Sequence, residues 1–395
     1  MAKVAIVRCE DYEPQRVEDA VRRALDLIGG LGPIVKRGQR VLLKPNLLRA
    51  APPERAVTTH PAIIRSMVAA VCEAGAQVWV GDSPGGIQWN VTDKVLAETE
   101  IGPAALEAGA EIRDFDSGGT EAIECPDAAV LKKFALARAV READVVLSLA
   151  KLKTHCQTLY SGAVKNLLGC LPGGGKIRVH QLAPKSRQLW AAFLDIYAVV
   201  RPRLALIDGI LAMEGEGPSH GKVRPLGLLI ASEDSVAADA VACRIIGYPP
   251  RAVKLFEQAE ERGLGVGDLR RIDVVGLPIE EAAVRDFVRP SNFAFEVIPG
   301  FLMKLIGRGV SVKPEIVQEL CKKCGMCQRS CPADAIDRHQ GLVIDSERCV
   351  RCFCCHELCP HDAIALKRAW FIRLYDYMRH QRKKRKQAKQ PGASE

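Results

Sequence analysis

Cysteines near the C-terminal end follow one pattern that occurs twice, offset by 28 residues. Each copy has the spacing C-x2-C-x2-C-x3-C-P and then continues into an x-D-A-I segment. The eight cysteines that keep this spacing are Cys321, Cys324, Cys327 and Cys331, and Cys349, Cys352, Cys355 and Cys359. Three thiolates in a C-x2-C-x2-C loop can wrap one corner of an iron–sulfur cubane. The pattern therefore predicts two [4Fe–4S] clusters as cofactors.

The fourth cysteine of each copy lies too far along the chain to complete the cluster of its own loop. In the bacterial pattern the two copies exchange this ligand. The exchange predicts one cluster on Cys321, Cys324, Cys327 and Cys359, and a second cluster on Cys331, Cys349, Cys352 and Cys355.

Structural zinc is the competing interpretation of clustered cysteines. Zinc sites usually take two C-x2-C pairs separated by a longer spacer, and the repeated three-cysteine loop does not have that form. Residues 318–366 resemble bacterial-type two-cluster ferredoxins, which implies an electron-transfer module. Cys354 has no ligand role in this scheme and is expected to pack near the second cluster.

The rest of the chain is long enough for a large core, with 395 residues in all and 48% hydrophobic content. The remaining cysteines are scattered rather than paired, and cubane clusters need reduced thiolates, so we expect a cytoplasmic protein. We find no secretory h-region and no stretch of membrane-spanning length, which predicts a soluble protein. The net charge of +9 is concentrated after residue 365, where ten Lys or Arg face two acids.

Apolar runs alternate with amphipathic helical patterns through the first 280 residues. Expected strands are 4–7, 41–43, 78–80, 145–149, 204–207, 226–230 and 272–275, and expected helices are 18–28, 61–74, 186–200 and 235–246. Such alternation predicts an α/β fold, a mostly parallel sheet with helices on both faces, followed by a small α+β ferredoxin-like domain.

Polar motifs follow four of these strands, where open α/β sheets place their ligand sites. The motifs are K-P-N at 44–46, G-D-S-P-G-G at 81–86, K-L-K-T-H at 151–155 and D-G at 208–209. Each motif alone is also compatible with an ordinary turn. Residues 151–180 combine cations with glycines, which favours a carboxylate or phosphate ligand, the alternative being a solvated loop.

These positions define the candidate site of the large domain. Candidate substrate-binding residues are Lys44, Asn46, Ser83, Lys151, Lys153 and Lys165. Candidate proton-transfer or metal-binding groups are Asp82, Asp208, Glu216 and His155, although the acidic loop around Glu216 is equally compatible with exposed turns. Neither G-x-x-x-x-G-K-S/T nor a strand-following G-x-G-x-x-G occurs, so nucleotide-hydrolysing and dinucleotide-binding folds gain no support.

The combination of motifs resembles the domain of unknown function 362 family, whose members often carry a C-terminal two-cluster ferredoxin. The motifs are K-P-N at 44–46, H-P at 60–61, G-D-S-P-G at 81–85, K-L-K-T-H at 151–155, G-A-V-K-N-L-L-G at 162–169 and G-E-G-P at 215–218. The resemblance covers nearly all of residues 1–366 and implies an iron–sulfur protein without assigning a substrate.

The domains are expected at 1–299 for the α/β domain, 300–318 for a linker helix, 319–366 for the 2x[4Fe–4S] domain and 367–395 for a basic amphipathic tail. The tail could contact a membrane surface or nucleic acid, or pack on its own protein. We expect an iron–sulfur redox protein of the oxidoreductase type, whose clusters relay electrons to or from an anionic small molecule on the α/β domain. The alternative is a non-catalytic electron carrier or adaptor for a partner redox protein or reductase.

Overall fold

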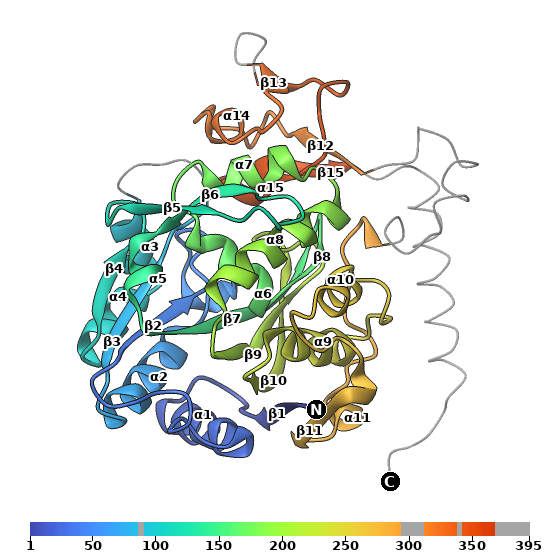
Figure 1. Ribbon diagram of the computed structural model, residues 1–395. Coiled ribbons are helices and arrows are strands. Elements are labelled where there is room, and N and C mark those ends of the chain that lie inside the picture. Colours follow the sequence, from blue (N-terminus) through green and yellow to red (C-terminus); the bar gives the residue numbers. More distant parts are fainter. Residues whose placement is uncertain (86–90, 294–311, 338–341, 368–395) are drawn as a thin grey trace, which may run out of the picture.

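The computed structural model describes residues 1–85, 91–293, 312–337 and 342–367 (Figure 1). The expected linker helix around 301–306 and the basic tail beyond Lys367 lie outside the described residues. No helix within these ranges is long and apolar enough to cross a membrane.

The large domain is built on one sheet with the strand order β11-β1-β10-β9-β7-β2-β3-β4, and β8 pairs with β7. Its strands are β1 (Ala2–Arg8), β2 (Arg40–Pro45), β3 (Gln77–Asp82), β4 (Glu111–Asp114), β7 (Val145–His155), β8 (Leu159–Ser161), β9 (Leu204–Glu214), β10 (Lys222–Ser232) and β11 (Ile272–Gly276). Pairing is parallel from β9 through β7, β2 and β3 to β4, whereas β10 runs antiparallel to both its neighbours. The predicted mostly parallel α/β sheet is confirmed.

Helices cover both faces of the sheet (Figure 1). They are α1 (Pro14–Ile28), α2 (Pro61–Glu73), α3 (Thr92–Glu98), α4 (Ile101–Glu107), α5 (Arg138–Glu142), α6 (Ala163–Asn166), α7 (Gly175–Leu182), α8 (Ser186–Val200), α9 (Ser235–Ile245), α10 (Leu255–Glu261) and α11 (Ile279–Ala282). Neighbouring strand residues enter opposite cores: Val41 and Leu43 pack with α1 and α2, while Leu42 packs in the core that holds α8 and α9. This alternation is the period-two pattern of a strand buried on both faces.

Local signals explain where α2 begins and ends. Pro61 occupies its first turn, where a missing N–H costs nothing, and the ring of His60 accepts the Ala62 N–H at 3.2 Å. The helix ends at Glu73, and Gly75 follows with φ of +75°. A left-handed backbone conformation is cheap for glycine, which is why glycine commonly follows the end of a helix.

The C-terminal domain sits at one end of the large domain (Figure 1). It contains β12 (Lys313–Ile316), β13 (Ile336–Asp337), β14 (Val343–Ile344), β15 (Ile364–Lys367), α14 (Met326–Arg329) and α15 (Cys354–Leu358). Residues 313–316, assigned from the sequence to the linker, pair with β15. A separate hairpin of β5 (Thr120–Glu124) and β6 (Lys133–Ala137) belongs to the large domain.

Two predicted strands end later than expected. β7 continues to His155 and β9 to Glu214, so the K-L-K-T-H motif and Asp208 lie inside strands rather than in loops after them. The residues up to His180 are not one loop either, because they form β8, α6 and α7. The motif residues are therefore held by sheet hydrogen bonds, which makes their positions rigid.

Candidate functional site

A small cavity of about 70 Å³ lies at the C-terminal ends of β2 and β3, against α6, α7 and α15. A space of this size accommodates a few water molecules or one small polar group. The large domain contributes Asn46, Asp82, Ser83, Lys165, Asn166, Lys176 and His180 to its lining, and the dicluster domain contributes Cys354, Glu357 and Leu358. The cavity is therefore shared between the two domains.

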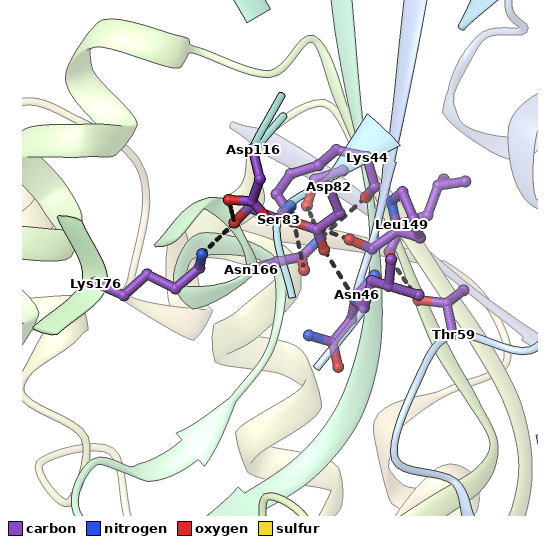
Figure 2. A network of polar contacts seen from close by, with 12 residues as sticks. Lys44, Asn46, Thr59, Asp82, Ser83, Asp116, Leu149, Asn166 and Lys176 are labelled. Atoms are coloured by element: carbon purple, nitrogen blue, oxygen red, sulfur yellow. Dashed lines mark hydrogen bonds and ion pairs between the residues drawn. The ribbon is translucent and has the colours of Figure 1, made fainter. Parts of the chain in front are cut away.

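Lys44 and Asp82 form an ion pair beneath this cavity (Figure 2). The ammonium of Lys44 lies 2.8 Å from Asp82 Oδ1, and both side chains are buried. Asp82 also accepts the Leu47 N–H at 2.8 Å, and Lys44 donates to the Pro45 carbonyl at 2.9 Å. Burial raises the pKa of Asp82 although Lys44 opposes the shift. Both charges are thus satisfied internally, and the pair positions the strand ends.

Ser83 connects two groups that the predicted site did not include, Lys176 and Asp116 (Figure 2). The Lys176 ammonium donates to Ser83 Oγ, and Ser83 Oγ donates to Asp116 Oδ1 at 2.6 Å. Asp116 also accepts the Gly173 N–H at 2.9 Å, which ties the glycine-rich turn to the site. Burial lowers the pKa of Lys176 to about 8, with Asp116 and Asp82 opposing the shift.

A second buried network surrounds Lys151 and Asp208. Their charged groups lie 2.8 Å apart, and both also contact the hydroxyl of Tyr12, at 2.8 Å and 2.7 Å respectively. Tyr12 stacks on His60 with ring centroids 3.5 Å apart, and the backbone N–H of His60 donates to Asp208 Oδ2. Lys151 and Asp208 are brought together as the strand-end prediction requires, but neither lines the cavity.

Lys153 is buried behind the cavity wall. Its ammonium donates to Asn46 Oδ1 at 2.6 Å and to the Val57 carbonyl at 2.7 Å, both neutral acceptors. Burial lowers its pKa well below the ordinary lysine value, and the charge of Lys165 adds to the shift. Lys153 therefore holds Asn46 at the cavity wall but does not line the cavity itself.

Glu357 on α15 lies against three basic side chains of the large domain. Its Oε2 is 3.5 Å from His155 Nε2, and the Nδ1 of that ring accepts the backbone N–H groups of Gln157 and Thr158. Burial lowers the pKa of His155 and of His180 to about 4, so both rings are neutral near pH 7. Burial works against ionisation of Glu357, but Lys165 and His155 outweigh it, and the pKa of Glu357 lies below its ordinary value.

Two basic groups at the cavity have hydrogen-bonding atoms without a partner in the described part of the chain. Within the described residues, the Lys165 ammonium lies 5.5 Å from the Phe193 ring but makes neither a hydrogen bond nor an ion pair. His180 Nδ1, in the same wall, is buried without a hydrogen-bond partner in the described parts of the chain. Buried polar groups are usually satisfied by protein, water or ligand, so these two groups can bind a water molecule or a polar ligand.

Glu216 lies apart from the other predicted residues. It accepts the N–H of Ser291 at 3.2 Å and the Ser291 hydroxyl, and it does not line the cavity. Within the described residues, the predicted carboxylates and His155 do not gather into a group of three or more side chains that could hold a metal ion. Glu357 and Asp116 were missed because their partners come from distant parts of the chain.

The cluster cysteines lie in two groups. Burial raises the pKa of Cys327 to about 11, and the neighbouring thiols that interact with it are Cys359, Cys321 and Cys324. Burial likewise raises the pKa of Cys355, with Cys352, Cys349, Cys327 and Cys331 as neighbours. These groupings fit the exchange of the fourth ligand between the two copies. Cys354 is buried beside Cys352 and hydrogen-bonds to it.

The large domain and the C-terminal domain each match a known protein family. A family described as a domain of unknown function (DUF362) matches residues 41–244, and a 4Fe-4S dicluster domain matches residues 313–360. The thylakoid-associated protein sll1697 of Synechocystis sp. is 34% identical over 268 residues, which are 66% of this chain and 79% of that protein.

A solved structure also aligns with the chain, the lactate racemase apoprotein from Thermoanaerobacterium thermosaccharolyticum. The TM-score is 0.41 with 13% identity, over 62% of this chain and 56% of that one. With the family match spanning about half of the chain and the cyanobacterial relative covered over most of its length, the protein belongs to the DUF362 family and carries a C-terminal dicluster domain that binds two [4Fe–4S] clusters.

Proposed function

We propose that this protein is an iron–sulfur oxidoreductase in which the clusters exchange electrons with an anionic small molecule bound in the cavity between the domains. The cavity itself supports this most strongly, because its walls combine the strand-end motifs with α15. That helix contains Cys355, a predicted ligand of the second cluster, and Glu357, which faces the large domain. A molecule in the cavity would lie beside the second cluster.

The charges around the cavity narrow the ligand to a small carboxylate or phosphate. Lys165 and His180 have unused donor capacity, and Ser83 and Lys176 form a hydroxyl–ammonium pair in the same wall. Carboxylate and phosphate oxygens accept the short, charge-assisted hydrogen bonds that such groups offer. Lys44 and Lys151 contribute less than the sequence predicts, because Asp82 and Asp208 already neutralise them.

The clusters would supply one-electron transfer when bound, and the protein's own groups would handle protons and position. Ser83 and Lys176 can hold a proton at the cavity wall, since the pKa of Lys176 near 8 allows both protonation states at physiological pH. Asn46 and Asn166 can orient the ligand through their amides. Exchange with a second redox partner would complete each turnover.

The alternative is a non-catalytic carrier, in which the buried lysines and the carboxylates that pair with them serve only to hold the strands in place. The internal pairing of Lys44 and Lys151 is the observation that favours it. In that case the cavity would hold water, and substitutions in its wall would leave electron transfer to a partner intact.

The Lys165→Met variant distinguishes the oxidoreductase from the carrier. The control is Lys94→Met, because Lys94 is exposed and its ammonium pairs with Glu98 on the surface. The reduced holoprotein would be mixed anaerobically with small carboxylates and phosphates while cluster reoxidation is followed by absorbance. We expect at least one compound to reoxidise wild type and Lys94→Met, and its apparent affinity to fall about tenfold or more in Lys165→Met, because a charged hydrogen bond contributes ~1.5–3 kcal/mol. Failure of every compound to bind or to reoxidise wild type would favour the carrier.

A further inference from the structure

The two cluster-binding regions differ in their access to solvent. Of the predicted ligands of the first cluster, Cys324 is exposed, Cys321 is half-buried, and Cys327 and Cys359 are buried. Of those of the second cluster, Cys331 and Cys349 are half-buried, and Cys352 and Cys355 are buried. Phe353, between those two, packs with Cys156 of the large domain. The second cluster therefore faces the large domain, while the loop of the first cluster and α14 lie on the outward side (Figure 1).

Electrons have to reach the outer cluster from a partner, because tunnelling between centres weakens steeply with distance. Of the predicted ligands within the described residues, Cys324 has the most exposed position. A protein partner that docks around Cys324 would lie beside a predicted ligand of the first cluster. A docking site for an electron-transfer partner is therefore expected on the surface around Cys324.

This surface carries more basic than acidic side chains. The side chain of Leu320, next to Cys321, is 50% exposed, and the neighbouring Glu319 is the exposed acid of this segment. Lys322 and Lys323 follow directly, and both are exposed without an ion pair among the residues that the structure describes. Arg329 is also exposed and donates only to the Cys324 carbonyl, at 3.2 Å.

An acidic groove elsewhere on the same domain offers a competing surface. It has a volume of about 470 Å³ and is lined by Asp334, Asp345 and Arg348 among others, along β13 and β14. None of its lining residues is a predicted cluster ligand. It would select a basic partner and would hold that partner against side chains rather than against a thiolate.

We propose that residues 320–324 together with Arg329, the outer-cluster loop, form the docking surface for a small, acidic one-electron carrier protein. The reduced centre of the carrier loses one electron and the first cluster gains it, with no bond made or broken and no proton moved. The electron then passes to the second cluster, and the reverse direction uses the same surface. This inference needs the two clusters but is independent of whether the inner cavity is catalytic.

The test is a Lys322→Glu/Lys323→Glu holoprotein, with Asp334→Lys/Asp345→Lys as a matched charge reversal in the acidic groove. Each is mixed in a stopped-flow instrument with a plant-type [2Fe–2S] ferredoxin as the acidic probe, in both redox directions. One direction is downhill whatever the potentials, so a rate is always measurable. Dithionite, a small reductant, serves as the second electron donor, and iron content verifies that the clusters are intact.

We expect the lysine variant to react with the carrier at least about tenfold more slowly at low salt and to lose most of its salt dependence, because rim charges act on association. Its reduction by dithionite should match wild type, and the aspartate variant should react with the carrier at least as fast as wild type. Equal carrier rates in wild type and the lysine variant would overturn the proposal. So would a slower reaction confined to the aspartate variant, which would place docking in the groove.

Discussion

The buried lysines at the strand ends differ in what neutralises them. Lys44 and Lys151 each lie 2.8 Å from a carboxylate, and Lys153 donates to two neutral oxygens. A buried charge without a partner costs several kcal/mol, so Asp82 and Asp208 offset the cost of burying Lys44 and Lys151. Lys165 differs because no carboxylate of the described residues lies within ion-pair distance of it. It is therefore the lysine most available to an external anion.

Gly169 tests how tightly the Lys44–Asp82 pair is packed. A Cβ atom at Gly169 would lie 2.0 Å from Asp82 Oδ1 and 2.8 Å from Lys44 Nζ. Gly169→Ala should push the pair apart and cost about 3–5 kcal/mol, the usual range for breaking a buried ion pair. Gly174→Ala is the control, because nothing lies within 4 Å of its Cβ position. Anaerobic denaturation should show a lower midpoint for the first variant alone; equal midpoints would mean that the pair can shift.

Lys176 should make anion binding and stability respond to pH in opposite directions. Burial lowers its folded-state pKa to about 8, so its ammonium is lost as the pH rises through that value and the affinity for an anion should fall. The unfolded chain keeps this proton up to about pH 10.4, so between these values the unfolded state binds more protons and Lys176 makes stability rise with pH. Both effects appear as differences between wild type and Lys176→Met, measured by titration calorimetry and denaturation. A difference that is flat between pH 7 and 9 would contradict this assignment.

At the scale of elements, the sheet was predictable because its strands are buried on both faces and read as apolar runs. The ends of β7 and β9 were not, because charged residues interrupt the apolar runs, at Lys151 in β7 and at Asp208 in β9. Lys151 lies directly across from Asp208 in the parallel pairing of these strands, so each charge is neutralised by its neighbour and the strands can continue. This pairing depends on strand order, and strand order is not contained in the local sequence around either residue.

The cluster ligands could be predicted from the sequence, whereas much of the remaining site could not. The cysteines could be predicted because the geometry of a cubane dictates their spacing within one short segment. Glu357 lies in that segment too, but its role depends on how α15 docks on the large domain. Arg49 contributes to this docking by donating to the Cys359 carbonyl at 3.1 Å and to the Ser219 carbonyl at 3.2 Å. No sequence pattern relates residues 310 positions apart in this way.

At the scale of the whole molecule, the two domains form one path that leads from the surface to the cavity. The outer-cluster loop is exposed, the second cluster lies against the large domain, and the cavity adjoins α15. Covalent attachment keeps the clusters at high effective concentration beside the cavity. Each end of the path then has its own proposed partner class, a carrier protein outside and a small anion inside.

The order of the two clusters along this path depends on the predicted exchange of the fourth ligand between the two motif copies. Cys359→Ala tests that exchange. Cys359 comes from the second copy of the motif but lies beside Cys327 of the first. If it completes the first cluster, its loss should remove about half of the bound iron and sulfide. The remaining EPR spectrum should then match that of Cys324→Ala and differ from that of Cys352→Ala. Cys354→Ala, which alters a buried cysteine outside both ligand sets, should keep both clusters. A Cys359→Ala spectrum that matches Cys352→Ala instead would show that each copy completes its own cluster, and the assignment of outer and inner clusters would have to be redrawn.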